Sequence, residues 1–105
     1  MHIVIMGCGR VGSMLARGLE RRGHSVAVID INVDSFRRLG FDFQGITVSG
    51  VGFDREVLEA ADIRHADGFA AVSSGDNSNI LAARVVREQY GVDNVVATTD
   101  RKSVV

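Results

Sequence analysis

A run of spaced glycines near the start of the chain, Gly7-Cys8-Gly9-Arg10-Val11-Gly12, constrains the fold more than any other feature of the sequence. The residues before it, His2–Met6, are mostly apolar, which indicates a buried strand. The residues after it place small and apolar side chains at the spacing of one helical stripe: Val11, Met14, Leu15, Gly18 and Leu19. The sequence therefore predicts a strand, a tight glycine turn and a helix that ends at Gly23.

Apolar runs and helical patterns continue to alternate along the rest of the chain. Further apolar runs predict strands at 25–29, Ile46–Ser49, 68–73 and 94–98. The segments between these runs predict a short helix from Asp34 to Leu39, a helix that Asp54 caps, and a long helix over Asp76–Tyr90. Gly91 is expected to end the long helix.

Strands that alternate with helices form a parallel sheet, because each crossover carries the chain back across one face of the sheet. Right-handed crossovers then favour the strand order 3-2-1-4-5. The expected fold is an α/β Rossmann-type doubly wound parallel sheet, with the whole range 1–105 in one domain. A complete fold of this type has a sixth strand, for which the tail 100–105 has no room, so we expect a domain truncated before that strand.

The composition and charge exclude several classes of function. The net charge is −1 and the charged residues are scattered, so no nucleic acid is expected as a partner. No apolar run approaches the roughly 20 residues of a membrane helix, so direct membrane insertion is not expected. The start of the chain lacks a basic region and a cleavage site, and its single cysteine fits a reducing compartment. The expected location is therefore the cytoplasm.

Each glycine of the loop has a separate expected role. Gly7 permits the tight turn, Gly9 leaves room for a phosphate to approach the backbone, and Gly12 lets the helix pack close to the strand. The N–H groups at the start of the helix and the helix dipole then favour a negatively charged group. The alternative is a turn that merely joins strand and helix. The strand, the helix and a downstream acid in register favour a phosphate-binding loop.

Asp30 follows the second predicted strand, where dinucleotide-binding folds place an acid that contacts the ribose. A carboxylate there accepts hydrogen bonds from ribose hydroxyls and repels a 2′-phosphate, so NADP is disfavoured as a ligand. A helix cap or a turn is the alternative role for Asp30, and Asn32 could serve as the cap instead. The sequence thus favours an adenine nucleotide without a 2′-phosphate.

Two further groups near the loop have open interpretations. Arg10 either leans over a pyrophosphate or is a solvated surface arginine. Ser73, Ser74 and Gly75 follow the fourth predicted strand, at the edge where open parallel sheets bind ligands, so hydroxyls there could contact ribose or phosphate. The alternative is a simple loop that leads to Asp76 as a helix N-cap, with Asn79 in the first turn.

The candidate ligand contacts all belong to loops at the carboxyl ends of the predicted strands. They are Gly7, Cys8, Gly9, Arg10, Val11, Gly12, Asp30, Ile31, Asn32, Val51, Gly52, Ser73, Ser74 and Gly75. Cys8 lies at a helix N-terminus, where a redox-switch thiol is one hypothesis and a small buried filler is the preferred interpretation. No metal site or catalytic residue is expected, because the histidines lack ligand spacing and no acid, base or nucleophile is arranged for hydride transfer.

Four segments of the chain, 3–12, 23–30, 57–63 and 73–79, carry a resemblance to a known family. Through them the chain resembles the N-terminal nucleotide-binding domain of regulators of potassium conductance, as in the Trk and Ktr uptake systems. The first two segments are shared with many dehydrogenases, whereas the last two point to the potassium regulators. The family often has Gly-Asp-Ala-Thr-Asp after the third strand, where this chain has Gly50-Val51-Gly52-Phe53-Asp54.

The resemblance implies a regulatory domain that is not an enzyme. It implies NAD(H) or ATP/ADP as ligand, with the phosphates held by the glycine loop and Arg10, and the ribose held by Asp30. It also implies a membrane potassium transporter or channel subunit as partner at the inner face of the cell membrane, and assembly as a homo-oligomer, either a dimer or a ring of dimers. The alternatives are a cofactor-binding fragment of an NAD-dependent oxidoreductase and a structural module with an unused loop.

Overall fold

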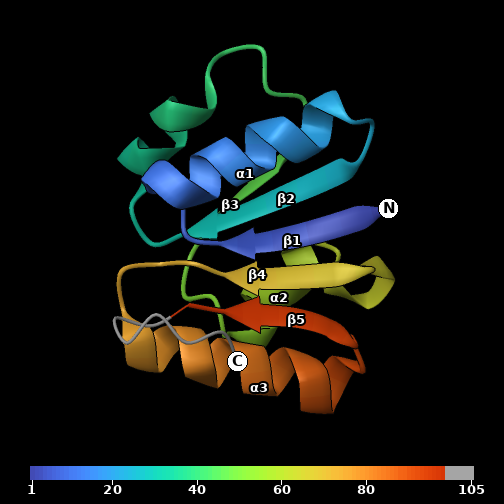
Figure 1. Ribbon diagram of the computed structural model, residues 1–105. Helices are drawn as coiled ribbons and strands as arrows, with labels where there is room; N and C mark the ends of the chain where they lie inside the picture. The colour runs from blue at the N-terminus through green and yellow to red at the C-terminus, as the bar shows by residue number, and fades with distance from the viewer. Residues whose placement is uncertain (99–105) are drawn as a thin grey trace.

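The computed structural model describes residues 1–98, so the tail 100–105 and the expected truncation before a sixth strand lie outside the described residues. The sheet is entirely parallel and has the order β3-β2-β1-β4-β5 (Figure 1). Its strands are β1 (His2–Met6), β2 (Ser25–Asp30), β3 (Ile46–Ser49), β4 (Gly68–Ala71) and β5 (Asn94–Ala97). The predicted strand order and Rossmann-type fold are confirmed.

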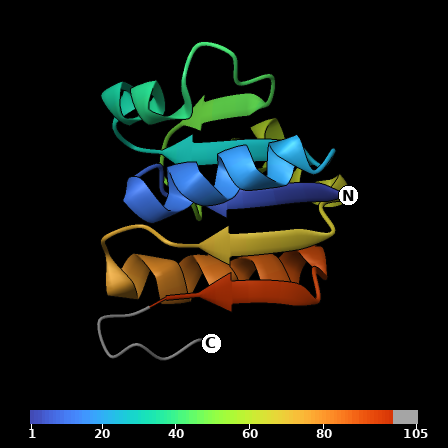
Figure 2. The ribbon, with the colours of Figure 1, turned by 45° about the horizontal axis from the view of Figure 1, so that its top comes forward.

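Helices cover both faces of the sheet, as Figures 1 and 2 show. One face carries α1 (Arg10–Arg21) and the 3-10 helix η1 (Val33–Leu39). The other face carries α2 (Arg55–Ala60), the 3-10 helix η2 (Ile63–His65) and α3 (Asp76–Tyr90). Because the central strands are buried on both faces, they consist of nearly continuous apolar residues, which is why the sequence predicted them so clearly.

Two apolar clusters, one on each face, form the core. Ile5 and Val28 point towards α1 and η1, where they pack with Ala16. Val4 and Phe69 belong to the cluster on the opposite face, which also contains side chains of α2, η2 and α3. Successive residues of β1 thus serve opposite clusters, as the alternation of side chains along a strand requires.

Several predicted boundaries differ from the structure. The fourth strand ends at Ala71 rather than at residue 73, because Ser73 bonds to a side chain of α3 instead of a neighbouring strand. The fifth strand likewise ends at Ala97, one residue earlier than predicted. The short helix is a 3-10 helix that starts at Val33, one residue before Asp34. Its N-cap is Asn32, whose side chain accepts a hydrogen bond of 3.0 Å from the Asp34 N–H.

The long helix has the predicted span and end, but Asp76 is not its N-cap, as the alternative interpretation of the loop after β4 had it. Gly75 occupies the N-cap position of α3, and Asp76 lies in the first turn. Gly91 ends the helix with a φ of 68°, a left-handed conformation that glycine adopts without strain. The start of α3 therefore has no side-chain cap from Gly75.

The predicted buried stripe of α1 was wrong for its first members. Val11 and Met14 are 61% and 68% exposed, whereas Gly12, Ser13 and Ala16 are buried. The reason is the close approach of Gly12 to the glycine turn, which rotates the helix so that its smallest residues face the sheet. A pattern of apolar residues alone does not predict that rotation.

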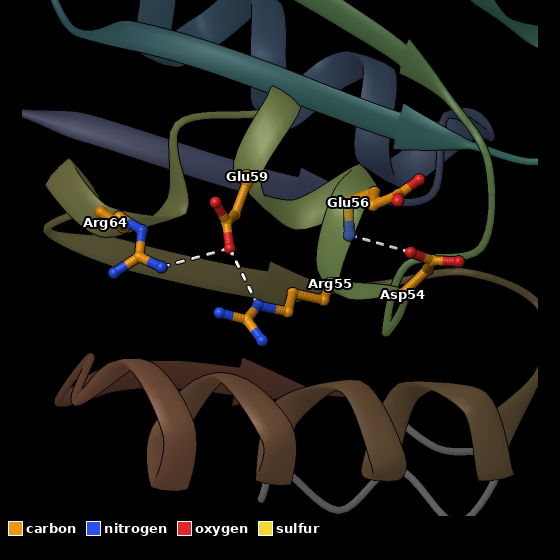
Figure 3. A network of polar contacts seen from close by, with 5 residues as sticks. All are labelled: Asp54, Arg55, Glu56, Glu59 and Arg64. Carbon is orange, nitrogen blue, oxygen red and sulfur yellow. Dashed lines mark hydrogen bonds and ion pairs between the residues drawn. The ribbon is translucent and has the colours of Figure 1, made fainter.

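A polar network holds the start of α2 and the helix after it (Figure 3). The Asp54 carboxylate caps α2 by accepting a hydrogen bond of 2.9 Å from the Glu56 N–H, as predicted for Asp54. Glu59 accepts from both Arg55, at 3.1 Å, and Arg64, at 3.2 Å. These pairs are exposed and contribute little stability, but the cap fixes where the loop after β3 ends.

None of the helices within residues 1–98 combines the length and the apolar character that a membrane crossing requires.

Candidate functional site

The main cleft of the described chain lies at the carboxyl edge of the sheet and has a volume of about 500 Å³. Because all strands point the same way, the loops after β1, β2, β3 and β4 meet at this edge (Figure 1). The cleft is lined by Met6, Gly7, Gly9, Ile29, Asp30, Ile31, Asn32, Ser35, Arg38, Gly50, Val51, Gly52, Phe53, Val72, Ser73, Ser74, Gly75 and Ser78. This is the size and position of a small-molecule site in a doubly wound sheet.

The glycine loop forms the floor of the cleft. Gly7 has a φ of +111°, which L side chains rarely adopt, and a Cβ there would lie 2.7 Å from the Ser73 backbone. Its N–H donates a hydrogen bond of 2.7 Å to the Ile29 carbonyl. Gly7 therefore permits the turn and also the contact between the loops after β1 and β4.

The other two glycines of the loop have contrasting surroundings. A Cβ at Gly12 would overlap with the carbonyl oxygen of Gly7. Any residue other than glycine at this position would therefore require the backbone to move. A Cβ at Gly9 would meet no atom within 4 Å, because Gly9 faces open space at the cleft. Gly12 thus has a packing role, whereas the absence of a side chain at Gly9 leaves the cleft floor open.

The start of α1 offers backbone donors beside the cleft. Gly9 is the N-cap and provides no side-chain hydrogen bond to the first turn of the helix. The first N–H groups of a helix have no partner within the helix, and the helix dipole adds partial positive charge there. An anionic group next to Gly9 would find donors already oriented.

Asp30 joins the glycine loop to the end of β2. Its Oδ2 atom accepts a hydrogen bond of 2.7 Å from the Cys8 N–H, and its Oδ1 atom accepts one of 2.8 Å from the Asn32 N–H. Each carboxylate oxygen has a further lone pair, so these bonds do not exhaust its capacity to accept. The carboxylate therefore braces the loop and is still available at the cleft, where Asp30 is part of the lining.

Two residues of the loop after β4 differ in how freely their side chains can act. The Ser73 hydroxyl donates to Asn79 Oδ1 at 2.6 Å and accepts from the Gly75 N–H at 3.3 Å. Ser74 is exposed and lines the cleft, with no hydrogen bond of its side chain among the described residues. The hydroxyl that is free to meet a ligand is therefore that of Ser74.

Cys8 is fully buried beneath the loop, and its Sγ donates to the Ser35 carbonyl at 3.3 Å. The pKa of the thiol is raised from 9.0 to about 11, mainly by burial and in addition by the negative charge of Asp30, while Arg38 lowers it in part. A redox-switch thiol needs a lowered pKa and access to solvent. The structure therefore opposes the redox-switch hypothesis and supports the filler interpretation.

This raised pKa predicts a loss of stability at high pH. In the unfolded chain the Cys8 thiol ionises near pH 9, whereas in the folded chain it keeps its proton until about pH 11, so stability falls as pH rises between these values. We expect the free energy of unfolding to fall by about 2 kcal/mol more in the wild type than in Cys8→Ala between about pH 8 and about pH 10.5. Urea titrations at both pH values measure the difference, and equal losses in the two proteins would contradict it.

Ten of the fourteen candidate residues line the cleft. They are Gly7, Gly9, Asp30, Ile31, Asn32, Val51, Gly52, Ser73, Ser74 and Gly75. Cys8, Arg10, Val11 and Gly12 are outside the lining. Arg10 is exposed, and its guanidinium has no ion-pair partner within residues 1–98.

Sequence reasoning missed several side chains of the cleft: Ser35, Arg38, Phe53 and Ser78. Arg38 matters most, because it adds a positive charge to a cleft that already contains the negative charge of Asp30. Its basic neighbour Arg37 and its position in the element directly after Asp30 were the available signal. Within the described part of the chain, no three His, Cys, Asp or Glu side chains gather closely enough to hold a metal ion.

The parallel sheet and the glycine loop at its carboxyl edge define a Rossmann-type nucleotide-binding fold. The TrkA-N domain family model matches residues 3–104. The chain belongs to the TrkA-N domain family.

Comparisons with individual proteins agree with this family. The chain is 66% identical over 97 residues to the Trk system potassium uptake protein TrkA of Streptomyces coelicolor, a match that covers 92% of this chain and 44% of that protein. The chain therefore spans less than half the length of this relative. The relative is named for potassium uptake and not for an enzymatic reaction, in agreement with the expectation that the chain is not an enzyme.

Two solved structures are similar to the fold. The Kef C-terminal domain of Shewanella denitrificans, in an AMP-bound form, is 18% identical, with a TM-score of 0.75 over 90% of this chain and 57% of that chain. This likeness shows the fold alone. The GsuK channel is 30% identical, with a TM-score of 0.68 over 84% of this chain and 16% of that chain.

Proposed function

We propose that the chain binds an adenine nucleotide, NAD(H) or ATP/ADP, in the cleft at the carboxyl edge of the sheet, and senses this ligand without transforming it. The observation that carries the proposal is the convergence of the open Gly9 position, the α1 N-terminus and the Asp30 carboxylate on one cleft of about 500 Å³. Backbone donors suit a diphosphate, and a carboxylate suits the adjacent ribose hydroxyls.

Other features support a nucleotide over another small anion. Ile31 is 73% exposed and Val51 is 38% exposed, and both line the cleft beside the polar groups. Exposed apolar side chains at a cleft provide a surface for a flat base, whereas a simple inorganic anion would need only the donors. The AMP bound to the Kef domain of similar fold is consistent with this choice of ligand class.

Gly9 provides the sharpest test of binding. Its φ of −86° is accessible to alanine, and the added methyl group would lie in open space at the cleft. We expect Gly9→Ala to keep the stability of the unliganded chain and to lower the affinity for ADP or NADH at least about tenfold, because the methyl group would occupy the approach of a phosphate. Isothermal titration calorimetry and thermal unfolding measure the two effects.

Gly18→Ala is the matched control, because a Cβ there also meets no atom within 4 Å but lies in the middle of α1. Replacing a glycine inside a helix with alanine stabilises by roughly 0.5–1 kcal/mol. We expect this variant to bind like the wild type. A wild type that binds none of ADP, ATP, NADH and NADPH would overturn the proposed function, and preferred binding of NADPH would overturn the exclusion of a 2′-phosphate.

We propose further that the chain acts as a cytoplasmic regulatory domain, assembled as a homo-oligomer, that controls a membrane potassium transporter. Support comes from the TrkA-N family and from the potassium uptake named for its relative. A ligand regulates only through a difference in affinity between two states, so a variant that loses the ligand should alter regulation. Rubidium uptake by cells that produce the whole protein should change with Gly9→Ala and not with Gly18→Ala.

A further inference from the structure

The side chain of Asn79 is the most completely bonded polar group in the described chain. It belongs to the first turn of α3, is 0% exposed, and uses every hydrogen-bonding capacity of its amide. Its Oδ1 atom accepts from the Ser73 N–H at 3.0 Å and from the Ser73 hydroxyl at 2.6 Å. Its Nδ2 group donates to the Ser73 carbonyl and to the Thr98 carbonyl, both at 2.9 Å.

These partners belong to two separate loops at the same edge of the sheet. Ser73 follows β4 and lines the cleft, whereas Thr98 directly follows β5. Figure 1 shows the start of α3 at the edge where β4 and β5 end. The Thr98 N–H in turn donates to the Ala71 carbonyl at 3.1 Å, so β4, α3 and the end of β5 are joined by one set of bonds.

Ser73 is also fixed from the side of the glycine loop. Its backbone lies so close to Gly7 that a Cβ on Gly7 would be 2.7 Å from the Ser73 Cα and N atoms. A ligand that shifts the glycine loop therefore moves Ser73, and Ser73 cannot move without a change at the Asn79 amide. Because both Nδ2 hydrogens belong to one planar amide, an amide that follows Ser73 changes its bond to Thr98 as well.

We propose that Asn79 is a positioning residue that couples occupancy of the cleft to the end of β5, an inference that rests on the proposed nucleotide binding. Asn79 holds Ser73, and through it the Gly75 end of the cleft, in the arrangement that receives the ligand. The same amide transmits the state of the cleft to Thr98. The two residue types most similar to asparagine do not fit, because aspartate lacks the two donors and glutamine is one methylene longer.

The test compares ADP and NADH binding to the wild type, Asn79→Asp and Asn79→Ala by calorimetry and by amide NMR. In the wild type we expect ADP or NADH to shift the resonances of the Thr98 N–H and of the Asn79 side-chain amide. In both variants we expect the affinity to fall about tenfold and the response at Thr98 to disappear. Val86→Ala, a change at a fully buried apolar residue seven positions further along the same helix, is the control for lost stability. It should keep both the affinity and the response.

Unchanged affinity and an unchanged Thr98 response in the Asn79 variants would overturn the coupling and leave Asn79 a purely structural residue. If neither Asn79 variant folds, the NMR titration of the wild type is sufficient to test the coupling. Ligand-induced shifts at Gly9 without a shift at Thr98 would also overturn the coupling. Failure of the proposed function would give a different result: neither ADP nor NADH would shift any resonance of the wild type. The proposed coupling would then be overturned together with the proposed binding.

Discussion

Gly12→Ala is expected to destabilise the chain by at least about 3 kcal/mol. An added Cβ would overlap with the Gly7 carbonyl oxygen, would lie 2.9 Å from the Gly7 carbonyl carbon, and would press on Val72 at 3.3 Å. The first two are backbone atoms of the glycine turn, so no side-chain rotation relieves the overlap. The start of α1 would have to lift away from the sheet. Urea unfolding followed by circular dichroism measures the loss.

Gly18→Ala serves again as the control, because it introduces the same methyl group into the same helix in open space. The two variants share the change in helix propensity, which favours alanine, so their difference reports the overlap at Gly12 alone. A cost below about 1 kcal/mol for Gly12→Ala would contradict the prediction. It would mean that the helix moves away from the turn with little loss of packing.

The strands were predictable from the sequence because apolar and β-branched runs between turn residues leave a direct trace in it. His2–Met6 and Ile46–Ser49 were predicted with the bounds that the structure shows, and Asp76–Tyr90 was predicted in full. Turn glycines and apolar runs are local signals that depend little on the rest of the molecule. The order of the strands followed from the handedness of the crossovers, which holds for nearly all parallel sheets.

The face that a helix buries was less predictable, because it depends on contacts that the sequence does not reveal. Met14 belongs to the apolar stripe of α1 by spacing but is 68% exposed, while the small polar residue Ser13 is buried. The overlap constraint at Gly12 sets the rotation of the helix, and it involves an atom of the turn rather than a pattern of side chains. The contact between Gly12 and the glycine turn, and not the apolar periodicity, therefore determines which face of α1 is buried.

The candidate site also has a part that the sequence predicts and a part that it does not. The glycine loop, Asp30 and the Ser73 loop were predictable, because the motif and the parallel topology place them at one edge. The position of Arg38 in the cleft was not predictable, because a short 3-10 helix has no periodic pattern that indicates which of its side chains face the cleft. The sequence placed Asn79 in the first turn of a helix, but its bond to Thr98 joins residues that are 19 positions apart.

Asp30→Ala is the other change with a large expected effect, because it removes two hydrogen bonds and a proposed ligand contact. The variant would leave the N–H groups of Cys8 and Asn32 without their acceptor, and Cys8 is fully buried. An unpaired buried donor costs about 1–3 kcal/mol, and hydrogen bonds to a charged group lie at the upper end. We expect a loss of about 3 kcal/mol in stability and a fall of at least about tenfold in ADP affinity, measured by urea unfolding and calorimetry.

Asp67→Ala separates these two effects. Asp67 plays the same structural part at the opposite edge of the sheet, where its Oδ2 atom accepts a hydrogen bond of 2.8 Å from the His2 N–H. The Asp67→Ala variant therefore loses a carboxylate that holds a backbone N–H, while the cleft is unchanged. Its affinity for ADP should equal that of the wild type. If Asp30→Ala lost stability but bound ADP as tightly as Asp67→Ala, Asp30 would be a brace for the glycine loop and not a ribose contact. If Asp30→Ala lost less than about 1 kcal/mol, its bond to Cys8 would not be what holds the loop in place.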